Sequence, residues 1–268
     1  MEAYFDNSAT TPVYPEVRDL MVKIMEEDYG NPSSLHMKGV TAARYIKDAR
    51  ESLAGEMKVM PKEIVFTSGG TESNNMALIG GALANRRAGN KIITTSVEHA
   101  SVGSPMDFLA GMGFDVVRIG VDSSGQIDMD QLMSEVDDDT IIVSVMYVNN
   151  EIGTVMPIAD IARLIKEKNP NVLFHVDAIQ AFGKYRIYPK RMGIDMMSIS
   201  GHKFHGPKGV GALFIRDRVK VKPIIYGGGQ QSGMRSGTEN VPGIAGMALA
   251  AEITYNGLEE KMEHLRQL

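Results

Sequence analysis

The chain has 268 residues, of which 43% are hydrophobic, so it can bury a large core in one domain or slightly more. Its net charge of -5 and its scattered Lys and Arg residues exclude the basic surface that nucleic-acid binding needs. It has no cysteine, which excludes disulfides and thiolate metal sites, and its six histidines show no metal-ligand spacing. No apolar run approaches the roughly 20 residues of a membrane helix, and the first residues resemble no signal peptide. We therefore expect a cytoplasmic protein.

The N-terminal part predicts an arm, two helices and a strand. Residues 1–14 form a short arm whose Asn, Ser and Thr residues are typical of a loop. Pro15 begins an amphipathic helix that ends near residue 30, and apolar residues recur at helical spacing over 39–57. Residues 63–67 then form an apolar strand. We expect the apolar residues of these elements to belong to the hydrophobic core.

A glycine turn follows this first strand. The run Ser68-Gly69-Gly70-Thr71-Glu72-Ser73-Asn74-Asn75 leads into a helix that we expect to begin near Asn75. A strand, a glycine turn and a helix N-terminus can present backbone N–H groups and the helix dipole to an anion, and Thr71 adds a hydroxyl. The turn at Gly70 and Thr71 is thus a candidate phosphate site, or else an ordinary capped turn. It lacks both the P-loop lysine and the dinucleotide spacing.

Strands and helices then alternate, and polar residues follow the strands. We predict strands over 91–97, 114–119 and 140–148, with helices over 128–136 and 157–168. His99 follows the first of these strands, where an imidazole is commonly structural but can also stack on an aromatic cofactor and move protons. Asn150 follows the last of them.

Two short buried strands, 172–176 and 195–200, carry the most informative residues. A right-handed crossover would place both strand ends at the carboxyl edge of a parallel sheet, where ligands bind. Five polar residues should converge on one crevice there: Asp177, Gln180, Ser200, His202 and Lys203. Such a set suits pyridoxal phosphate, with a Schiff base on the lysine, the carboxylate at the pyridine nitrogen, and the serine and histidine at the phosphate. The alternative is a surface lysine and a turn-capping aspartate.

The C-terminal part predicts a hairpin, a loop and a helix. The glycines at 206 and 209 precede a strand, 210–215, that contains the third glycine at 211, so this spacing indicates a hairpin rather than a nucleotide loop. A glycine-rich loop covers 227–238, and residues 241–268 are helical. We therefore expect an arm at 1–14, a cofactor-binding large domain at 15–240 and a linker helix at 241–268, leading toward a C-terminal small domain that is absent.

The whole chain resembles the cysteine desulfurases of iron-sulfur cluster assembly, which are class V, fold-type I pyridoxal-phosphate enzymes. The matching segments, in the order of that family, are YFDNSATTP, GNPSSLH, EIVFTSGGTESNN, VEHASV, VNNEIGT, FHVDAIQAFGK, SISGHKFHGPKGVG and GMRSGTENV. The resemblance implies the α/β fold of a fold-type I transferase large domain, with a mainly parallel sheet and helices on both faces.

The resemblance also implies roles for single residues. It implies a Schiff base at Lys203, Asp177 at the pyridinium nitrogen and His99 stacked on the ring as a second catalytic residue. The remaining cofactor contacts that it implies are Asn150 and Gln180 near the phenolic oxygen, and Gly70, Thr71, Ser200 and His202 at the phosphate. Thr238 would join that phosphate site from the neighbouring subunit of a homodimer. The implied partners are L-cysteine and a sulfur-acceptor protein, such as an iron-sulfur scaffold.

The chain departs from the family in one respect. Family members continue into a smaller domain with a nucleophilic cysteine and an arginine for the substrate carboxylate, and neither can be found here. We therefore expect a partial chain, inactive alone, of an enzyme that converts L-cysteine to L-alanine and holds the sulfur as a cysteine persulfide, for clusters or tRNA thiolation. The alternatives are another class V enzyme, such as a selenocysteine lyase or an aminotransferase, and a non-catalytic cofactor-binding scaffold.

Overall fold

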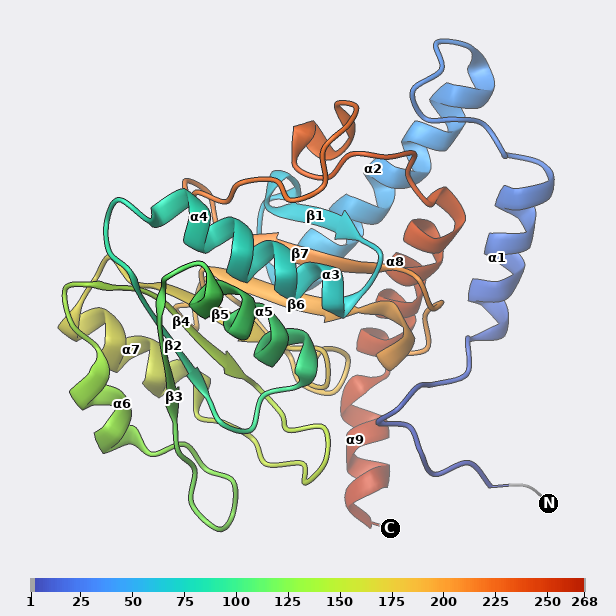
Figure 1. Ribbon diagram of the computed structural model, residues 1–268. Helices are drawn as coiled ribbons and strands as arrows, with labels where there is room; N and C mark the ends of the chain where they lie inside the picture. The colour runs from blue at the N-terminus through green and yellow to red at the C-terminus, as the bar shows by residue number, and fades with distance from the viewer. Residues whose placement is uncertain (1–2, 268) are drawn as a thin grey trace.

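A seven-stranded sheet forms the centre of the computed structural model, which describes residues 3–267 (Figure 1). Positions 1, 2 and 268, which belong to the expected arm and final helix, lie outside the described residues. The strand order is β1-β7-β6-β5-β4-β2-β3. The strands are β1 (Ile64–Thr67), β2 (Lys91–Thr95), β3 (Asp115–Ile119), β4 (Thr140–Met146), β5 (Leu173–Asp177), β6 (Met196–Ser200) and β7 (Gly211–Ile215).

Only β7, among the strands of residues 3–267, runs against its neighbours. It pairs antiparallel with β1 and β6, whereas β2–β3, β2–β4, β4–β5 and β5–β6 are parallel pairs. The other strands consequently all end at one edge of the sheet. In β6 and β7, Ser200 lies opposite Gly211, which is the hairpin pairing expected of the intervening glycine turn. The mainly parallel sheet that the sequence predicts is confirmed.

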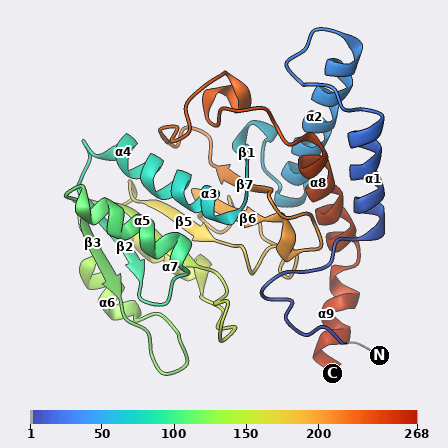
Figure 2. The ribbon, with the colours of Figure 1, turned by 45° about the vertical axis from the view of Figure 1, so that its right-hand side comes forward.

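Helices cover both faces of this sheet, as expected (Figures 1 and 2). The helices are α1 (Pro15–Glu26), α2 (Met37–Met57), α3 (Gly70–Asn75), α4 (Gly81–Asn85), α5 (Ala100–Gly111), α6 (Met129–Glu135), α7 (Ile158–Lys168), α8 (Val241–Asn256) and α9 (Leu258–Gln267). Single helical turns occur at η1 (Pro61–Glu63), η2 (Met76–Gly80), η3 (Gly201–Lys203) and η4 (Gln230–Gly233). Helices α3, α4 and α5 lie on one face, and α1, α2, α6, α7 and α8 lie on the other.

The core lies between the sheet and these helices. Helix α7 illustrates how the apolar residues of a helix form this core. Its Ile158, Ile161 and Ile165 recur at helical spacing and are all buried against the sheet. Each such side chain contributes about 1.5–3 kcal/mol of hydrophobic stabilisation. Helix α8 is also mostly buried and packs against α1 and α2, whereas α9 is mostly exposed. No helix within residues 3–267 is both long and apolar enough to cross a membrane.

Several predicted boundaries are wrong, most clearly the start of the helix after β1. The helix expected near Asn75 begins at Gly70 and continues through η2 into α4. The early start is explained by Gly69, whose φ of 152° turns the chain sharply, and by Glu72, whose Oε2 accepts a hydrogen bond of 2.8 Å from the backbone N–H of Ser68. Strands β2 and β4 also end earlier than predicted, at Thr95 and Met146.

Candidate active site

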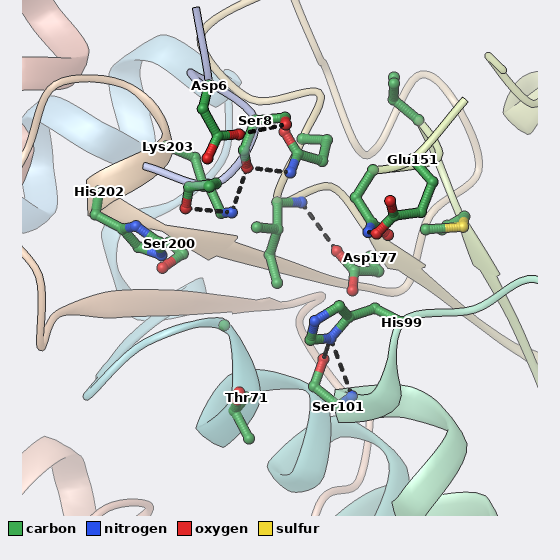
Figure 3. Close-up of a pocket in the computed structure, with 17 residues that line it drawn as sticks. Asp6, Ser8, Thr71, His99, Ser101, Glu151, Asp177, Ser200, His202 and Lys203 are labelled. Atoms are coloured by element: carbon green, nitrogen blue, oxygen red, sulfur yellow. Dashed lines mark hydrogen bonds between the residues drawn. The ribbon is translucent and has the colours of Figure 1, made fainter. Parts of the chain in front are cut away.

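A cavity of about 420 Å³ opens at the carboxyl edge of the sheet (Figure 3). The predicted site residues that line it are Gly70, Thr71, His99, Asn150, Asp177, Gln180, Ser200, His202 and Lys203. They come from the ends of β1, β2, β4, β5 and β6, which the parallel topology brings to the same edge. Every predicted site residue except Thr238 is therefore brought to one place.

Asp177 and Lys203 place a carboxylate and an amine in the same cavity. Asp177 ends β5 and is buried; its Oδ1 accepts from the backbone N–H of Ile179 at 3.0 Å. Burial raises the pKa of Asp177, while that hydrogen bond and the nearby Lys203 oppose the rise. Burial lowers the pKa of Lys203, against the attraction of Asp177. A lowered pKa leaves more of the lysine as the uncharged, nucleophilic amine.

The N-terminal arm forms one wall of the cavity, which the sequence did not reveal. Lys203 Nζ donates hydrogen bonds to the backbone oxygens of Ser8 at 2.5 Å and Ala9 at 2.9 Å, and Gln180 Nε2 donates to Ser8 O at 2.8 Å (Figure 3). The hydroxyl of Thr11 fixes the arm by donating to His202 O at 2.9 Å. These partners lie far apart in the sequence, and backbone carbonyls have no sequence signature. No local pattern could have identified them.

Four residues of the cavity are suited to an anion. Gly70 and Thr71 lie in the first turn of the helical segment 70–85, and Ser200 and His202 line the same cavity. Gly70 has a packing role as well, because a Cβ there would lie 2.1 Å from Cδ1 of Ile179. Helix N–H groups, hydroxyls and an imidazole are the donors that phosphate sites use.

His99 is the N-cap of α5, and its ring lies in the cavity beside Asp177 (Figure 3). Its Nδ1 accepts a hydrogen bond of 3.0 Å from the backbone N–H of Ser101. The Asn150 side chain donates to Glu151 Oε1 at 2.6 Å, and both residues line the cavity.

Thr238 does not line this cavity in the single chain. It lies in a separate hollow of about 130 Å³, together with Ser68, Gly209 and Arg235. Arg235 binds Glu72 of α3 through both carboxylate oxygens, at 2.8 and 3.2 Å. The contribution of Thr238 to the site of a neighbouring subunit stays a prediction.

The family model described as aminotransferase class-V matches residues 3–268. The chain belongs to the class V aminotransferase family. Among the relatives of this class V chain is the protein named cysteine desulfurase IscS of Methanosarcina thermophila, which is 47% identical over 99% of this chain and 65% of its own length. The chain thus spans about two thirds of the length of the curated relatives it matches. The resemblance seen in the sequence is confirmed.

Solved structures give the same fold for this class V chain. A protein titled NifS-like has a TM-score of 0.98 at 45% identity, and the match covers 100% of this chain and 73% of that one. A structure titled SspA in complex with cysteine has a TM-score of 0.88 at 42% identity, over 94% of this chain and 72% of that one.

The residues of the cavity fit pyridoxal phosphate, the cofactor of this family. A phosphate needs the donor-rich end at Gly70 and Thr71, a pyridine nitrogen needs a carboxylate such as Asp177, and an aldehyde needs an amine such as Lys203. The volume of about 420 Å³ is in the range of ordinary cofactor pockets. Within residues 3–267, no cluster of three or more His, Asp or Glu side chains could hold a metal ion.

Proposed function

We propose that this protein binds pyridoxal phosphate and that the complete protein is a cytoplasmic cysteine desulfurase. The observation that carries the proposal is that Lys203 and Asp177, at the ends of neighbouring strands, line one cavity together with residues suited to phosphate: Gly70, Thr71, Ser200 and His202. The names of the relatives, cysteine desulfurase and NifS-like protein, support the same reading. The bound cofactor would withdraw electrons from the bonds broken in the substrate.

Each residue of the cavity would have a distinct task. Lys203 would hold the cofactor covalently through its amine, and Asp177 would keep a proton on the ring nitrogen. His99 would lie against the ring and move protons at its Nε2. The remaining contacts would be made by Gly70, Thr71, Ser200 and His202 at the phosphate, and by Asn150 and Gln180 near the phenolic oxygen.

The substrate would be L-cysteine, and the products would be L-alanine and a persulfide. In this reaction a thiolate of the enzyme attacks the substrate sulfur, the carbon–sulfur bond breaks, and the sulfur remains on the enzyme. The 268 residues contain no cysteine, so the thiolate would come from outside them. The persulfide would then pass its sulfur to an acceptor such as an iron-sulfur scaffold or a tRNA-thiolating protein. A selenocysteine lyase would instead release selenium and leave cysteine intact.

The cavity would be completed in a homodimer. The loop 227–238 would place Thr238 at the phosphate end of the neighbouring subunit's cavity, related by a two-fold axis. The position of Thr238 supports this proposal, since it is exposed and lies outside the cavity of its own subunit, in a separate hollow. Light scattering should give a dimer for the cofactor-loaded protein. A monomer with full cofactor occupancy would contradict this arrangement.

Covalent capture of the cofactor tests the central proposal. Protein mixed with pyridoxal phosphate, reduced with borohydride and mapped by mass spectrometry should carry the label on Lys203, and Lys203→Ala should carry none. Lys184 supplies a sharp control, because burial lowers its pKa to about 8 and its Nζ lies 3.4 Å from the backbone oxygen of Lys203. Lys184→Ala should keep the label on Lys203. Label on Lys184 in the wild-type protein would overturn the assignment.

A further inference from the structure

Asn74 lies behind the cavity and connects two of the proposed site residues. It belongs to α3 and is fully buried. Its Nδ2 donates one hydrogen bond to Oδ2 of Asp177 at 2.8 Å and another to Oγ of Ser101 at 2.9 Å. Because Oδ1 of Asp177 is already bonded to the backbone N–H of Ile179, both oxygens of this carboxylate have a fixed donor. These two donors fix the orientation of the carboxylate plane from the side that faces away from the cavity.

The same chain of hydrogen bonds reaches His99. Oγ of Ser101 lies 2.8 Å from Nδ1 of His99. Since this oxygen accepts a proton from Asn74, its own hydroxyl proton is available to Nδ1, which also accepts from the backbone N–H of Ser101. A nitrogen that faces two donors carries no proton in the neutral imidazole. The ring proton therefore resides on Nε2.

The orientation of the Asn74 amide has a cost in free energy. Its Oδ1 is buried and has no hydrogen-bond partner among residues 3–267. Turning the amide over would point that oxygen at the Asp177 carboxylate and remove both donated bonds, so the orientation seen is the favoured one. A buried polar atom without a partner is uncommon in a native fold and is found where a functional arrangement demands it.

We propose that Asn74 is a positioning residue that aligns the Asp177 carboxylate directly and, through Ser101, holds His99 with Nδ1 as an acceptor and its ring proton on Nε2. This inference rests on the proposed cofactor site. Asn74 contacts Asp177 and Ser101 and does not line the cavity, so it would act on the cofactor only through Asp177 and His99. Ser101 carries the effect to His99, while the bond to Asp177 is direct.

The cofactor-free chain, labelled with ¹⁵N-histidine, allows a direct test by NMR. The wild-type His99 nitrogens should show the Nε2–H tautomer, with the signals assigned from His99→Gln. Ser101→Ala removes one of the two donors to Nδ1, and Asn74→Ala frees the hydroxyl to turn away, so both should shift the signals toward tautomer-averaged values. Ser101→Thr keeps a hydroxyl and should restore the wild-type shifts. Asn75→Ala, a matched change at the adjacent residue, should leave them unchanged.

Cofactor affinity distinguishes the direct bond of Asn74 to Asp177 from the path through Ser101 to His99. Asn74→Ala should raise the Kd for pyridoxal phosphate by about 10-fold through loss of a hydrogen bond to a charged group, whereas Ser101→Ala should raise it less. Unchanged His99 shifts in Ser101→Ala and unchanged affinity in Asn74→Ala would overturn the inference. If Asn74→Ala fails to fold, the Ser101 variants decide the question. If the wild-type chain binds no cofactor, the proposed function fails, while the NMR result still decides the role of the network.

Discussion

Glu98 accepts a hydrogen bond of 2.9 Å from the backbone N–H of Met146, which ties the segment after β2 to the end of β4. The same oxygen accepts from the hydroxyl of Thr95 at 2.7 Å. Although Glu98 is half-buried as a residue, its second oxygen, Oε2, is buried without a partner among residues 3–267. Burial raises the pKa of Glu98 to about 8, against these two hydrogen bonds.

Glu98→Gln should stabilise the protein, and more so as the pH rises. The native state keeps its proton up to about pH 8, whereas the unfolded chain loses it near pH 4.5, so the wild-type protein loses up to about 1.4 kcal/mol of stability per pH unit across that window. Glutamine has no proton to lose. Urea unfolding at pH 5.5, 6.5 and 7.5 should show that the free energy of unfolding of Glu98→Gln exceeds that of the wild type by an amount that grows with pH. Glu252→Gln, on the exposed side of α8, should show no such pH-dependent difference. A difference that does not change with pH would refute the prediction that Glu98 is buried as a neutral carboxyl group.

His175 should make the protein sensitive to acid. This histidine of β5 is fully buried, with Nδ1 at 2.8 Å from Oγ of Ser144 and Nε2 at 3.0 Å from Oγ of Ser198, and burial lowers its pKa to about 3. Below about pH 6.5 His175 binds a proton in the unfolded chain but stays unprotonated in the native state. Stability should therefore fall by up to about 1.4 kcal/mol per pH unit from 6.5 toward 3. His175→Asn should flatten this slope in urea unfolding, whatever its absolute stability. An unchanged slope would contradict the prediction.

Asp177→Asn should weaken cofactor binding while keeping the shape of the site. The amide can still fill the space at the end of β5, but it carries no charge to hold a proton on a pyridine nitrogen. We expect the Kd for pyridoxal phosphate to rise at least about 10-fold, in line with the loss of a charge-assisted bond, and the visible absorption of the bound cofactor to change. Spectra and affinity equal to the wild type would remove Asp177 from the site.

The 268-residue chain alone should not desulfurate cysteine, even when it is loaded with pyridoxal phosphate. It contains no thiol that could attack the substrate sulfur and hold it as a persulfide, and serine and lysine cannot replace one. Added L-cysteine should do no more than change the absorption of the bound cofactor. Alanine should not accumulate beyond a control with free cofactor. Alanine and sulfide formed above that control, by protein whose mass matches these residues, would show that the nucleophile is not a protein thiol.

The sequence alone predicted the strands and the residues that follow them. Short apolar runs bounded by Gly and Pro identified β5 and β6, and their polar ends identified Asp177 and Lys203. These inferences succeed because strand burial is encoded locally, in runs of a few residues. The start of α3 was missed, because the apolar period begins after Asn74 while the helix itself begins at Gly70.

The sequence by itself determined which chemical groups this protein has and at which strand ends they occur, since residue type and strand pattern are local properties. The tertiary structure alone decided which backbone groups and buried side chains contact these residues. It laid the arm carbonyls of Ser8 and Ala9 against Lys203, and it joined Asn74 of α3 to Asp177 of β5. Such contacts join residues distant in the chain, so they depend on the packing of the whole fold, and a backbone carbonyl or a buried amide looks alike in the sequence wherever it occurs.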